Sequence, residues 1–243
     1  MISTTEGDNY VIGIDAGGTR IRIAVACQTE IIAQWTGDLP LLQNAKTEIQ
    51  FILDAITNLL SKAKINVKSL QGIGLATAAI VDRLTGVVIC WPNRPYWQGI
   101  PLRELFHSVF PVPLYIEDDA NAAAFGELRF GNGKGYQSLA YITVSTGIGC
   151  GLVLQEKIYT GEHGWAGEIG HTTAVYNGAI CTCGKSGCLQ AEASGKAIAR
   201  KWLEKANVNY KNIDGSFVAA QAASGDILAR DIFKEAATLV GIS

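Results

Sequence analysis

The chain begins with a segment in which apolar and polar residues alternate with the two-residue period of β-strands. VIGID (Val11–Asp15) predicts a first strand, AGGT (Ala16–Thr19) a tight turn, and RIRIAVA (Arg20–Ala26) a returning strand with its isoleucines on one face. A third strand, IIAQWTG, follows Gln28 and Thr29. The pattern therefore predicts an antiparallel, three-stranded start.

The segment Asn44–Lys64 changes to the period of an α-helix. Its apolar residues recur three or four positions apart, among them Ile49, Ile52, Ile56 and Leu60. Such a stripe needs an apolar surface to cover, and the preceding strands offer one. We expect a helix packed on a sheet, which is an α/β layer.

The α/β pattern continues as far as an acidic junction. The expected elements are strands at Leu70–Ala76 and around Val87–Trp91, a short helix near Leu102–Phe110, and a strand at Val112–Asp118. This last strand leads directly into DANAAAFGELRF, a helical segment that starts at Asp119. A carboxylate where a strand ends and a helix begins is a common place for chemistry.

The second half of the chain repeats the opening pattern. A strand at Ser138–Val144 leads into the turn Ser145-Thr146-Gly147, and GCGLVLQ returns as a second strand. Two such units, about 130 residues apart, look like an internal duplication.

Helical patterns follow at Ala191–Ala206 and at Asp226–Val240. No stretch rich in proline or serine separates the two halves. We therefore predict two lobes, residues 1–118 and 119–243, joined without a flexible linker.

Composition narrows the class of protein. Apolar residues make up 48% of the chain and charged residues 17%, which is ample for a buried core and unlike a disordered protein. The formal charge of −2 gives no basic field for nucleic acid, so no nucleic-acid partner is expected. Met1–Tyr10 lacks the basic start and apolar stretch of a secretory signal, and no apolar run approaches the ~20 residues of a membrane span. We expect a cytoplasmic protein without membrane contact.

Two glycine turns are candidate phosphate sites. Gly17-Gly18-Thr19 follows a strand that ends in Asp15, and it offers backbone N–H groups, a hydroxyl and a carboxylate that can act through Mg²⁺. The alternative is a tight turn whose glycines need positive φ. The second turn, Thr143–Gly147, favours phosphate binding, because two such turns can hold one polyphosphate from both sides. Neither turn matches a P-loop or a dinucleotide fingerprint.

Three of the six cysteines fall within eight residues, at Cys181, Cys183 and Cys188. With His171 they form a Cys₃His set, which is typical of a closed, structural Zn²⁺ site in a reducing compartment. Glycines between Cys183 and Cys188 let the chain fold back toward the first pair. The alternative is three unrelated cysteines in a loop.

The other cysteines, Cys27, Cys90 and Cys150, lie singly in apolar stretches. Cysteine in such surroundings behaves as a small hydrophobic residue, so we expect all three to be buried.

Five segments of the chain form a recognisable set. They are DAGGT (Asp15–Thr19), EDDANAAAFGE (Glu117–Glu127), STGIGCG (Ser145–Gly151), HGWAGEIGH (His163–His171) and CTCGKSGC (Cys181–Cys188). Together they closely resemble the ROK family of bacterial sugar kinases and sugar-responsive repressors, in the family's order and from Val11 to the last residue. The resemblance implies the two-lobed actin-like ATPase fold, which is ribonuclease H-like, and a possible homodimer.

The resemblance also implies roles for single positions. Asp119 matches the catalytic base that takes a proton from the sugar hydroxyl as it attacks the γ-phosphate of ATP, although Asp is also a common helix N-cap. Positions that match contacts with a hexose or hexosamine substrate are Asp118, Glu168, His171, Gln190, Ala79 and Asn93. Positions that match the nucleotide-phosphate turns are Asp15, Gly17, Gly18, Thr19, Thr146 and Gly147. The implied cofactors are ATP, Mg²⁺ and a structural Zn²⁺ bound by His171, Cys181, Cys183 and Cys188.

Four positions depart from the family's usual residues. Asp118 replaces Asn, Ala78-Ala79 replaces Pro-Gly, Gln190 replaces Glu, and Ser145 replaces the first Gly of a GTG turn. A second carboxylate beside Asp119 is expected to raise the pKa of one of the two by like-charge repulsion. Gln190 accepts a hydrogen bond, as Glu does, but also donates one.

The first hypothesis is an ATP-dependent hexose kinase, with glucose slightly favoured over an N-acetylated hexosamine or fructose. Family members normally continue past the helix expected to end near Val240, so either this sequence is incomplete or the protein is a shortened member. A catalytically weak or inactive sugar-binding relative is the main alternative, because of Asp118, Gln190 and the length. A transcriptional regulator would carry a helix-turn-helix before the first lobe, and only ten residues precede the first strand, which disfavours that reading.

Overall fold

The protein divides into two compact units. The computed structural model describes residues 9–243, so the segment Met1–Asp8, in which no secretory signal was predicted, lies outside the described residues. Unit 1 is Met1–Ala122 and unit 2 is Ala123–Ser243. The division falls inside helix α3 (Asp119–Phe130), a few residues beyond the boundary expected from the sequence.

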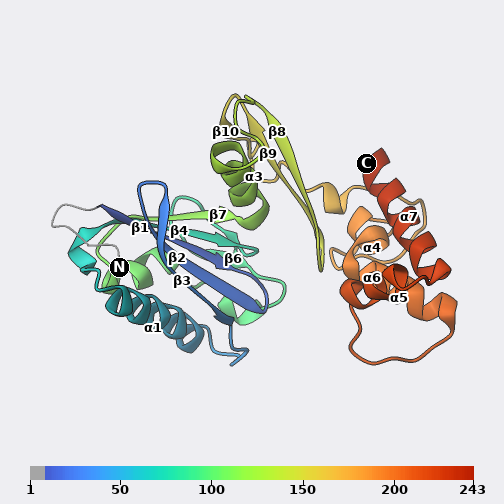
Figure 1. The fold of residues 1–243 in the computed structure, drawn as a ribbon, viewed down its shortest axis with the longest axis horizontal. Helices are drawn as coiled ribbons and strands as arrows, with labels where there is room; N and C mark the ends of the chain where they lie inside the picture. Colours follow the sequence, from blue (N-terminus) through green and yellow to red (C-terminus); the bar gives the residue numbers. More distant parts are fainter. Residues whose placement is uncertain (1–8) are drawn as a thin grey trace. The chain divides into compact units, whose positions relative to one another are not determined.

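Unit 1 is built on a mixed five-stranded sheet in the order β3-β2-β1-β4-β7 (Figure 1). Strands β1 (Tyr10–Ala16), β2 (Arg20–Cys27) and β3 (Glu30–Asp38) form an antiparallel meander. Strands β4 (Leu70–Thr77) and β7 (Leu114–Asp118) continue the sheet in parallel on the other side of β1. The predicted antiparallel start is confirmed.

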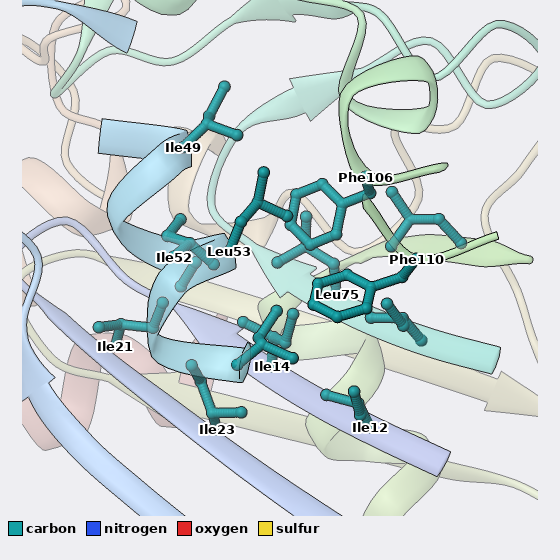
Figure 2. Close-up of a cluster of buried hydrophobic side chains, with 14 of the residues drawn as sticks. Ile12, Ile14, Ile21, Ile23, Ile49, Ile52, Leu53, Leu75, Phe106 and Phe110 are labelled. Atoms are coloured by element: carbon teal, nitrogen blue, oxygen red, sulfur yellow. The ribbon is translucent and has the colours of Figure 1, made fainter. Parts of the chain in front are cut away.

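Helix α1 (Ala45–Ala63) covers this sheet, as the apolar stripe predicted. Asn44 caps its first turn by accepting a hydrogen bond from the Thr47 N–H, and Lys64 ends it in the left-handed region. Figure 2 shows its buried residues beside those of β1 and β2, namely Ile49, Ile52 and Leu53 with Ile12, Ile14, Ile21 and Ile23. Burying each such side chain contributes about 1.5–3 kcal/mol, so this layer is the main core of unit 1.

Shorter elements connect the parallel strands of unit 1. They are η1 (Val67–Ser69), β5 (Ile80–Val81), β6 (Val88–Cys90), η2 (Pro95–Trp97) and α2 (Leu102–Val109). Strands β5 and β6 form a two-stranded sheet of their own.

The expectation that all three isolated cysteines are buried is wrong. Cys150 is buried, but Cys27 is half-buried and Cys90 is exposed. Cys90 belongs to the small β5–β6 sheet, which is separate from the main sheet. An apolar run in a short hairpin therefore does not bury every residue of the run.

Unit 2 opens with a three-stranded antiparallel sheet in the order β10-β9-β8. Its strands are β8 (Leu139–Val144), β9 (Ile148–Leu154) and β10 (Lys157–Ile158). The second half of α3 packs on this sheet through Ala124 and Leu128. The strand–turn–strand pair β8–β9 repeats the β1–β2 pair of unit 1.

Four helices complete unit 2, and three of them depart from the sequence prediction. They are α4 (Leu189–Ala193), α5 (Gly195–Ala206), α6 (Gly215–Ala223) and α7 (Ile227–Ile242). The single helix expected at 191–206 is wrong, because Ser194 is extended and its side chain caps α5. Helix α6 was not predicted, since its small, mostly apolar residues show little periodicity. Within residues 9–243, no helix combines the length and apolar character that crossing a bilayer requires.

Candidate active site and metal centre

Several predicted site segments of unit 1 lie along one edge of its sheet. Strands β1, β4 and β7 are parallel neighbours, with Ala16 paired to Thr77 and Thr77 paired to Asp118. The segments that follow these strand ends are Gly17-Gly18, Ala78-Ala79 and the start of α3 at Asp119. The carboxyl ends of parallel strands are where open α/β sheets bind their ligands.

The first glycine turn leaves little room for side chains. Neither Gly17 nor Gly18 is among the described residues with positive φ, so the reading as a tight turn that requires positive φ is wrong. A Cβ on Gly18 would lie 3.1 Å from Nδ2 of Asn93, and a Cβ on Gly17 would lie 3.3 Å from the carbonyl oxygen of Arg20. The predicted sugar contact Asn93 therefore lies next to the predicted phosphate turn.

Asp15, at the end of β1, has a charged neighbour. It faces Arg22 in the β1–β2 register, and Arg22 Nη1 lies 2.6 Å from Asp15 Oδ2. A cation recruited by Asp15 therefore has to compete with the Arg22 guanidinium.

Glu117 and Asp118, which precede α3, are both engaged in local hydrogen bonds. Glu117 Oε1 accepts from Arg83 Nη2 at 2.6 Å and from Asn121 Nδ2 at 3.2 Å. Asp118 Oδ1 accepts from the backbone N–H groups of Ala120 at 3.0 Å and Asn121 at 3.1 Å. This is the pattern of a helix N-cap, so Asp118 performs the capping that was considered for Asp119.

Asp119 is the first residue of α3 and is half-buried. Carboxylates are favoured at the first turn of a helix because the peptide dipoles place partial positive charge there. Asp119 is therefore a carboxylate that lies where β7 ends and α3 begins, as the sequence predicted.

In unit 2, the four predicted metal ligands converge. The ligand atoms of His171, Cys181, Cys183 and Cys188 all lie within 4.8 Å of one another. His171 Nδ1 is 3.6 Å from Cys181 Sγ, and the sulfurs of Cys183 and Cys188 are also 3.6 Å apart. Tetrahedral Zn²⁺ with ordinary Zn–S bonds separates its sulfur ligands by about 3.8 Å. The donor set and its spacing thus fit a four-coordinate metal.

Two of these thiols have strongly shifted pKa values. Burial raises the pKa of Cys181, but hydrogen bonds from the backbone and side chain of Cys183, from His171 and from Gln190 outweigh it and lower the pKa to about 6. Burial, together with thiol hydrogen bonds to Cys183 and Cys181, raises the pKa of Cys188 to about 12. A coordinated cation would deprotonate Cys188, because a thiol bound to a metal loses its proton.

The segment 171–188, which carries the four candidate ligands and is called the metal loop below, folds back as the glycine pattern predicted. Gly184 and Gly187 have φ of 89° and 73°, a region that favours glycine. A Cβ on Gly187 would lie 1.7 Å from the carbonyl oxygen of Val175, so the loop also needs the missing side chain there. Behind the loop, Glu192 accepts a hydrogen bond from the Ala179 N–H at 2.6 Å and pairs with Lys201 at 3.1 Å.

Gln190 links the metal loop to the second glycine turn. Its Nε2 lies 3.3 Å from Thr182 Oγ1 and 3.7 Å from Cys181 Sγ. A Cβ on Gly147 would lie 2.8 Å from Gln190 Oε1. The amide donor that distinguishes Gln190 from the usual Glu is therefore directed at the metal loop.

Glu168 lies three residues before the metal ligand His171, directly before η3 (Ile169–His171), and it is exposed. Unit 2 therefore brings together Gly147, Gln190 and the metal cluster through contacts, with Glu168 and Thr146 adjacent to them along the chain.

Two charged residues near the first glycine turn were missed by the sequence analysis. Arg94 and Glu48 are both fully buried and form an ion pair. A signal was present for Glu48, since it lies among the buried positions of α1, beside Ile49 and four residues before Ile52. No comparable signal marks Arg94, which lies in a loop between two prolines.

Comparison with known proteins places these features in a family. The ROK family model matches residues 11–243. A glucokinase from Streptomyces coelicolor is 32% identical over 244 residues, which cover 95% of this chain and 75% of that protein. A xylose repressor from Caldicellulosiruptor bescii is 31% identical, covering 100% of this chain and 63% of the repressor. The chain belongs to the ROK family.

A solved structure supports the fold. A ROK family glucokinase from Streptomyces griseus, in complex with glucose and AMPPNP, matches with a TM-score of 0.78 and 32% identity, covering 96% of this chain and 77% of that one. The fold is that of the actin-like, ribonuclease H-like ATPases, as predicted. The chain spans about two thirds to three quarters of the length of these relatives.

Proposed function

We propose that this protein is an ATP-dependent sugar kinase that transfers the γ-phosphate of ATP to a hydroxyl of a hexose, with glucose as the first candidate. The observation that carries the proposal is the common edge of β1, β4 and β7, where the Gly17-Gly18 turn and Asp119 follow neighbouring strand ends. Phosphoryl transfer needs groups that position the phosphates and a carboxylate at the nucleophile, roles that this turn and Asp119 would fill. The similarity to glucokinases supports the same reading.

In this proposal each unit supplies part of the chemistry. Asp119 accepts the proton of the attacking hydroxyl, and Asn93 and Ala79 contact the sugar from unit 1. Glu168, His171 and Gln190 contact the sugar from unit 2. Backbone N–H groups at Gly17, Gly18, Thr19, Thr146 and Gly147 bind the phosphates. Mg²⁺ held near Asp15 would neutralise phosphate charge when bound.

The metal centre is proposed to be structural. Zn²⁺ bound by His171 and the three cysteines would have no open position for water, so it would hold the loop rather than take part in the reaction. His171 then belongs to both the metal and the sugar sites, and Gln190 hydrogen-bonds Cys181. An ordered metal loop would therefore also fix the positions of the proposed sugar contacts His171 and Gln190.

A second candidate function is sugar binding without catalysis. The match to a xylose repressor along the whole chain favours this reading as directly as the glucokinase match favours a kinase. Asp118 and Gln190 differ from the family's usual residues at positions proposed to contact sugar. In this case the chain would bind a sugar and release no ADP.

A coupled assay for ADP release over a panel of sugars decides between the two functions. The panel contains glucose, fructose, mannose, the N-acetylated hexosamines and xylose, each with ATP and Mg²⁺. We expect release with at least one hexose, above the rate with ATP alone. Saturable sugar binding by calorimetry without ADP release would establish the binding protein instead. A homodimer remains a prediction, which light scattering tests.

A further inference from the structure

A single arginine connects several loops of unit 1. Arg94 has no exposed surface, and its Nη2 donates to the carbonyl oxygens of Gly18 at 3.1 Å and Leu39 at 3.0 Å. Its Nη1 donates to the carbonyl oxygen of Pro40 at 2.9 Å and to Glu48. The guanidinium also lies 5.5 Å from the centre of the Trp91 ring. One planar group therefore fixes the first glycine turn against the segment that follows β3.

Glu48 is the counter-charge, and its carboxylate is fully used. Oε1 accepts from the Leu42 N–H and the Tyr96 hydroxyl, both at 2.7 Å. Oε2 accepts from Trp97 Nε1 at 2.8 Å and from Arg94. The carboxylate thus comes from the main helix of unit 1, and its partners come from the segment after β3 and from residues 94–97.

The turn is held to the same segment a second time. The Leu39 N–H donates to the carbonyl oxygen of Thr19 at 2.8 Å, next to the bond from Arg94 to Gly18. Asn93, the residue before Arg94, has Nδ2 at 3.1 Å from the place of a Gly18 Cβ. The position of Arg94 therefore determines both the conformation of the glycine turn and the position of Asn93.

A contribution to folding stability alone does not explain the buried Arg94–Glu48 pair. The desolvation of two buried charges commonly cancels their attraction, and apolar replacements of similar volume are often tolerated. What an apolar pair lacks is the fixed fork of a guanidinium, which can bond several acceptors in set directions. That property matters where a backbone turn has to keep its shape.

We propose that the buried Arg94–Glu48 pair is a positioning device for the nucleotide, which holds the Gly17-Gly18 turn in its phosphate-binding shape and Asn93 beside it. The proposal rests on the function proposed for this chain, and it adds two residues that do not themselves touch the substrate. Lys in place of Arg94 keeps the charge beside Glu48 but loses the fork, so it cannot bond Gly18, Leu39, Pro40 and Glu48 together.

The test compares two variants with a matched control. Arg94→Lys keeps a buried cation, and the double variant Glu48→Leu with Arg94→Met replaces the pair by apolar groups. Leu60→Ala, in the same helix as Glu48 but more than three turns away, destabilises unit 1 without touching the turn. AMPPNP affinity, the KM values for ATP and hexose, kcat and the melting temperature are measured for each protein.

We expect both pair variants to stay folded and to lose roughly 10²-fold in kcat/KM for ATP, as misplaced binding groups do. The KM for ATP should rise more than the KM for hexose. Arg94 donates a hydrogen bond directly to Gly18, whereas it affects Asn93 only as the next residue along the chain. AMPPNP affinity should fall in parallel. Leu60→Ala should lower the melting temperature and leave both KM values unchanged.

Wild-type AMPPNP affinity and KM for ATP in a folded pair variant would overturn the proposal, as would equal losses in Leu60→Ala. If the wild type binds AMPPNP but phosphorylates no sugar, the proposed kinase function is wrong. The AMPPNP affinities of wild type and pair variants still test whether Arg94 and Glu48 position the turn. If the wild type does not bind AMPPNP, the phosphate-turn assignment and this proposal fail together.

Discussion

The two units open with the same strand–turn–strand unit but surround it differently. Strand β1 is paired on both sides, by β2 and β4, and every second residue of it is buried. Among the described residues, β8 pairs with β9 alone, and none of its residues is fully buried. The segments VIGID and LAYITV are similarly apolar, so the difference comes from what packs on each strand. Apolar character marks a strand, but the neighbouring elements decide how deeply it is buried.

The two glycine turns are also held by different means. Buried charges, those of Arg94 and Glu48, hold the first turn from within unit 1. The second turn lies against Gln190, which hydrogen-bonds the metal loop, and its Ser145 carbonyl accepts from the Gly195 N–H at 2.8 Å. The first turn therefore depends on a buried ion pair, and the second on the order of the metal loop.

Loss of the metal should have the largest effect and should be confined to unit 2. Cys183→Ser removes one of four ligands, so we expect at least about 100-fold weaker Zn²⁺ retention. Hydrogen exchange should then speed up over residues 171–195 and stay unchanged over 10–27. Cys90→Ser, outside the cluster, is the control and should keep one Zn²⁺ per chain by elemental analysis. No Zn²⁺ in the wild type would refute the metal centre.

Loss of one buried charge should have the next largest effect, now confined to unit 1. Glu48→Ala leaves the Arg94 guanidinium buried without its counter-charge, which costs about 3–5 kcal/mol. Urea unfolding followed by tryptophan fluorescence measures the change, and Glu104→Ala, an exposed acidic residue of α2, serves as the control. Zn²⁺ content should not change. A loss below about 1 kcal/mol would mean that the pair is solvated in solution.

Acid should weaken both units through one buried carboxylate in each. Burial raises the pKa of Glu48, but hydrogen bonds from Tyr96, Trp97, Leu42 and Arg94 outweigh it, so the pKa is lowered. The pKa of Glu192 is lowered in the same way, with burial outweighed by the Ala179 N–H and Lys201. A carboxyl whose pKa is lowered by folding stabilises the protein above its unfolded pKa, and this stability is lost as pH falls through the folded value.

The free energy of unfolding should therefore decrease as the pH falls below about 4.5, the ordinary pKa of a glutamate side chain. Glu48→Gln and Glu192→Gln should each have a shallower dependence of the urea midpoint on pH in this range. Parallel curves for wild type and variants would show that neither carboxylate carries the effect.

The exposed pair of Asp15 and Arg22 should matter least. Their side chains are 43% and 61% exposed, and such ion pairs contribute at most about 1 kcal/mol. Arg22→Ala should leave the urea midpoint nearly unchanged, and raising the salt concentration should remove what difference remains. A loss as large as that of Glu48→Ala would contradict the contrast between exposed and buried charges.

Much of the fold could be predicted from local patterns. The β1–β2–β3 meander, α1 and the junction of β7 with α3 follow from the periodicity of apolar residues. The break at Ser194 could not be predicted in this way, because Ser is compatible with a helix interior and with a cap. Helix α6 could not be predicted either, because its residues show little helical periodicity.

The predicted metal cluster required only the spacing of soft ligands, and the four ligand atoms do converge. Which of two adjacent carboxylates caps α3 could not be predicted, since either can do so by type, and the backbone geometry selects Asp118. The Arg94–Glu48 pair joins residues 46 positions apart, a distance that local patterns do not reach.

In the proposed function, Asp119 is the base of a sugar kinase. The most direct measurement is the rate of ADP release with the preferred hexose for wild type, Asp119→Asn and Asp118→Asn, at saturating ATP and sugar. Asn keeps the size of Asp and its ability to accept a capping hydrogen bond. We expect Asp119→Asn to lose at least about 10²-fold in kcat with sugar binding preserved, and Asp118→Asn to lose much less. A similar kcat for Asp119→Asn and wild type, with a large loss in Asp118→Asn, would contradict this assignment and make Asp118 the base.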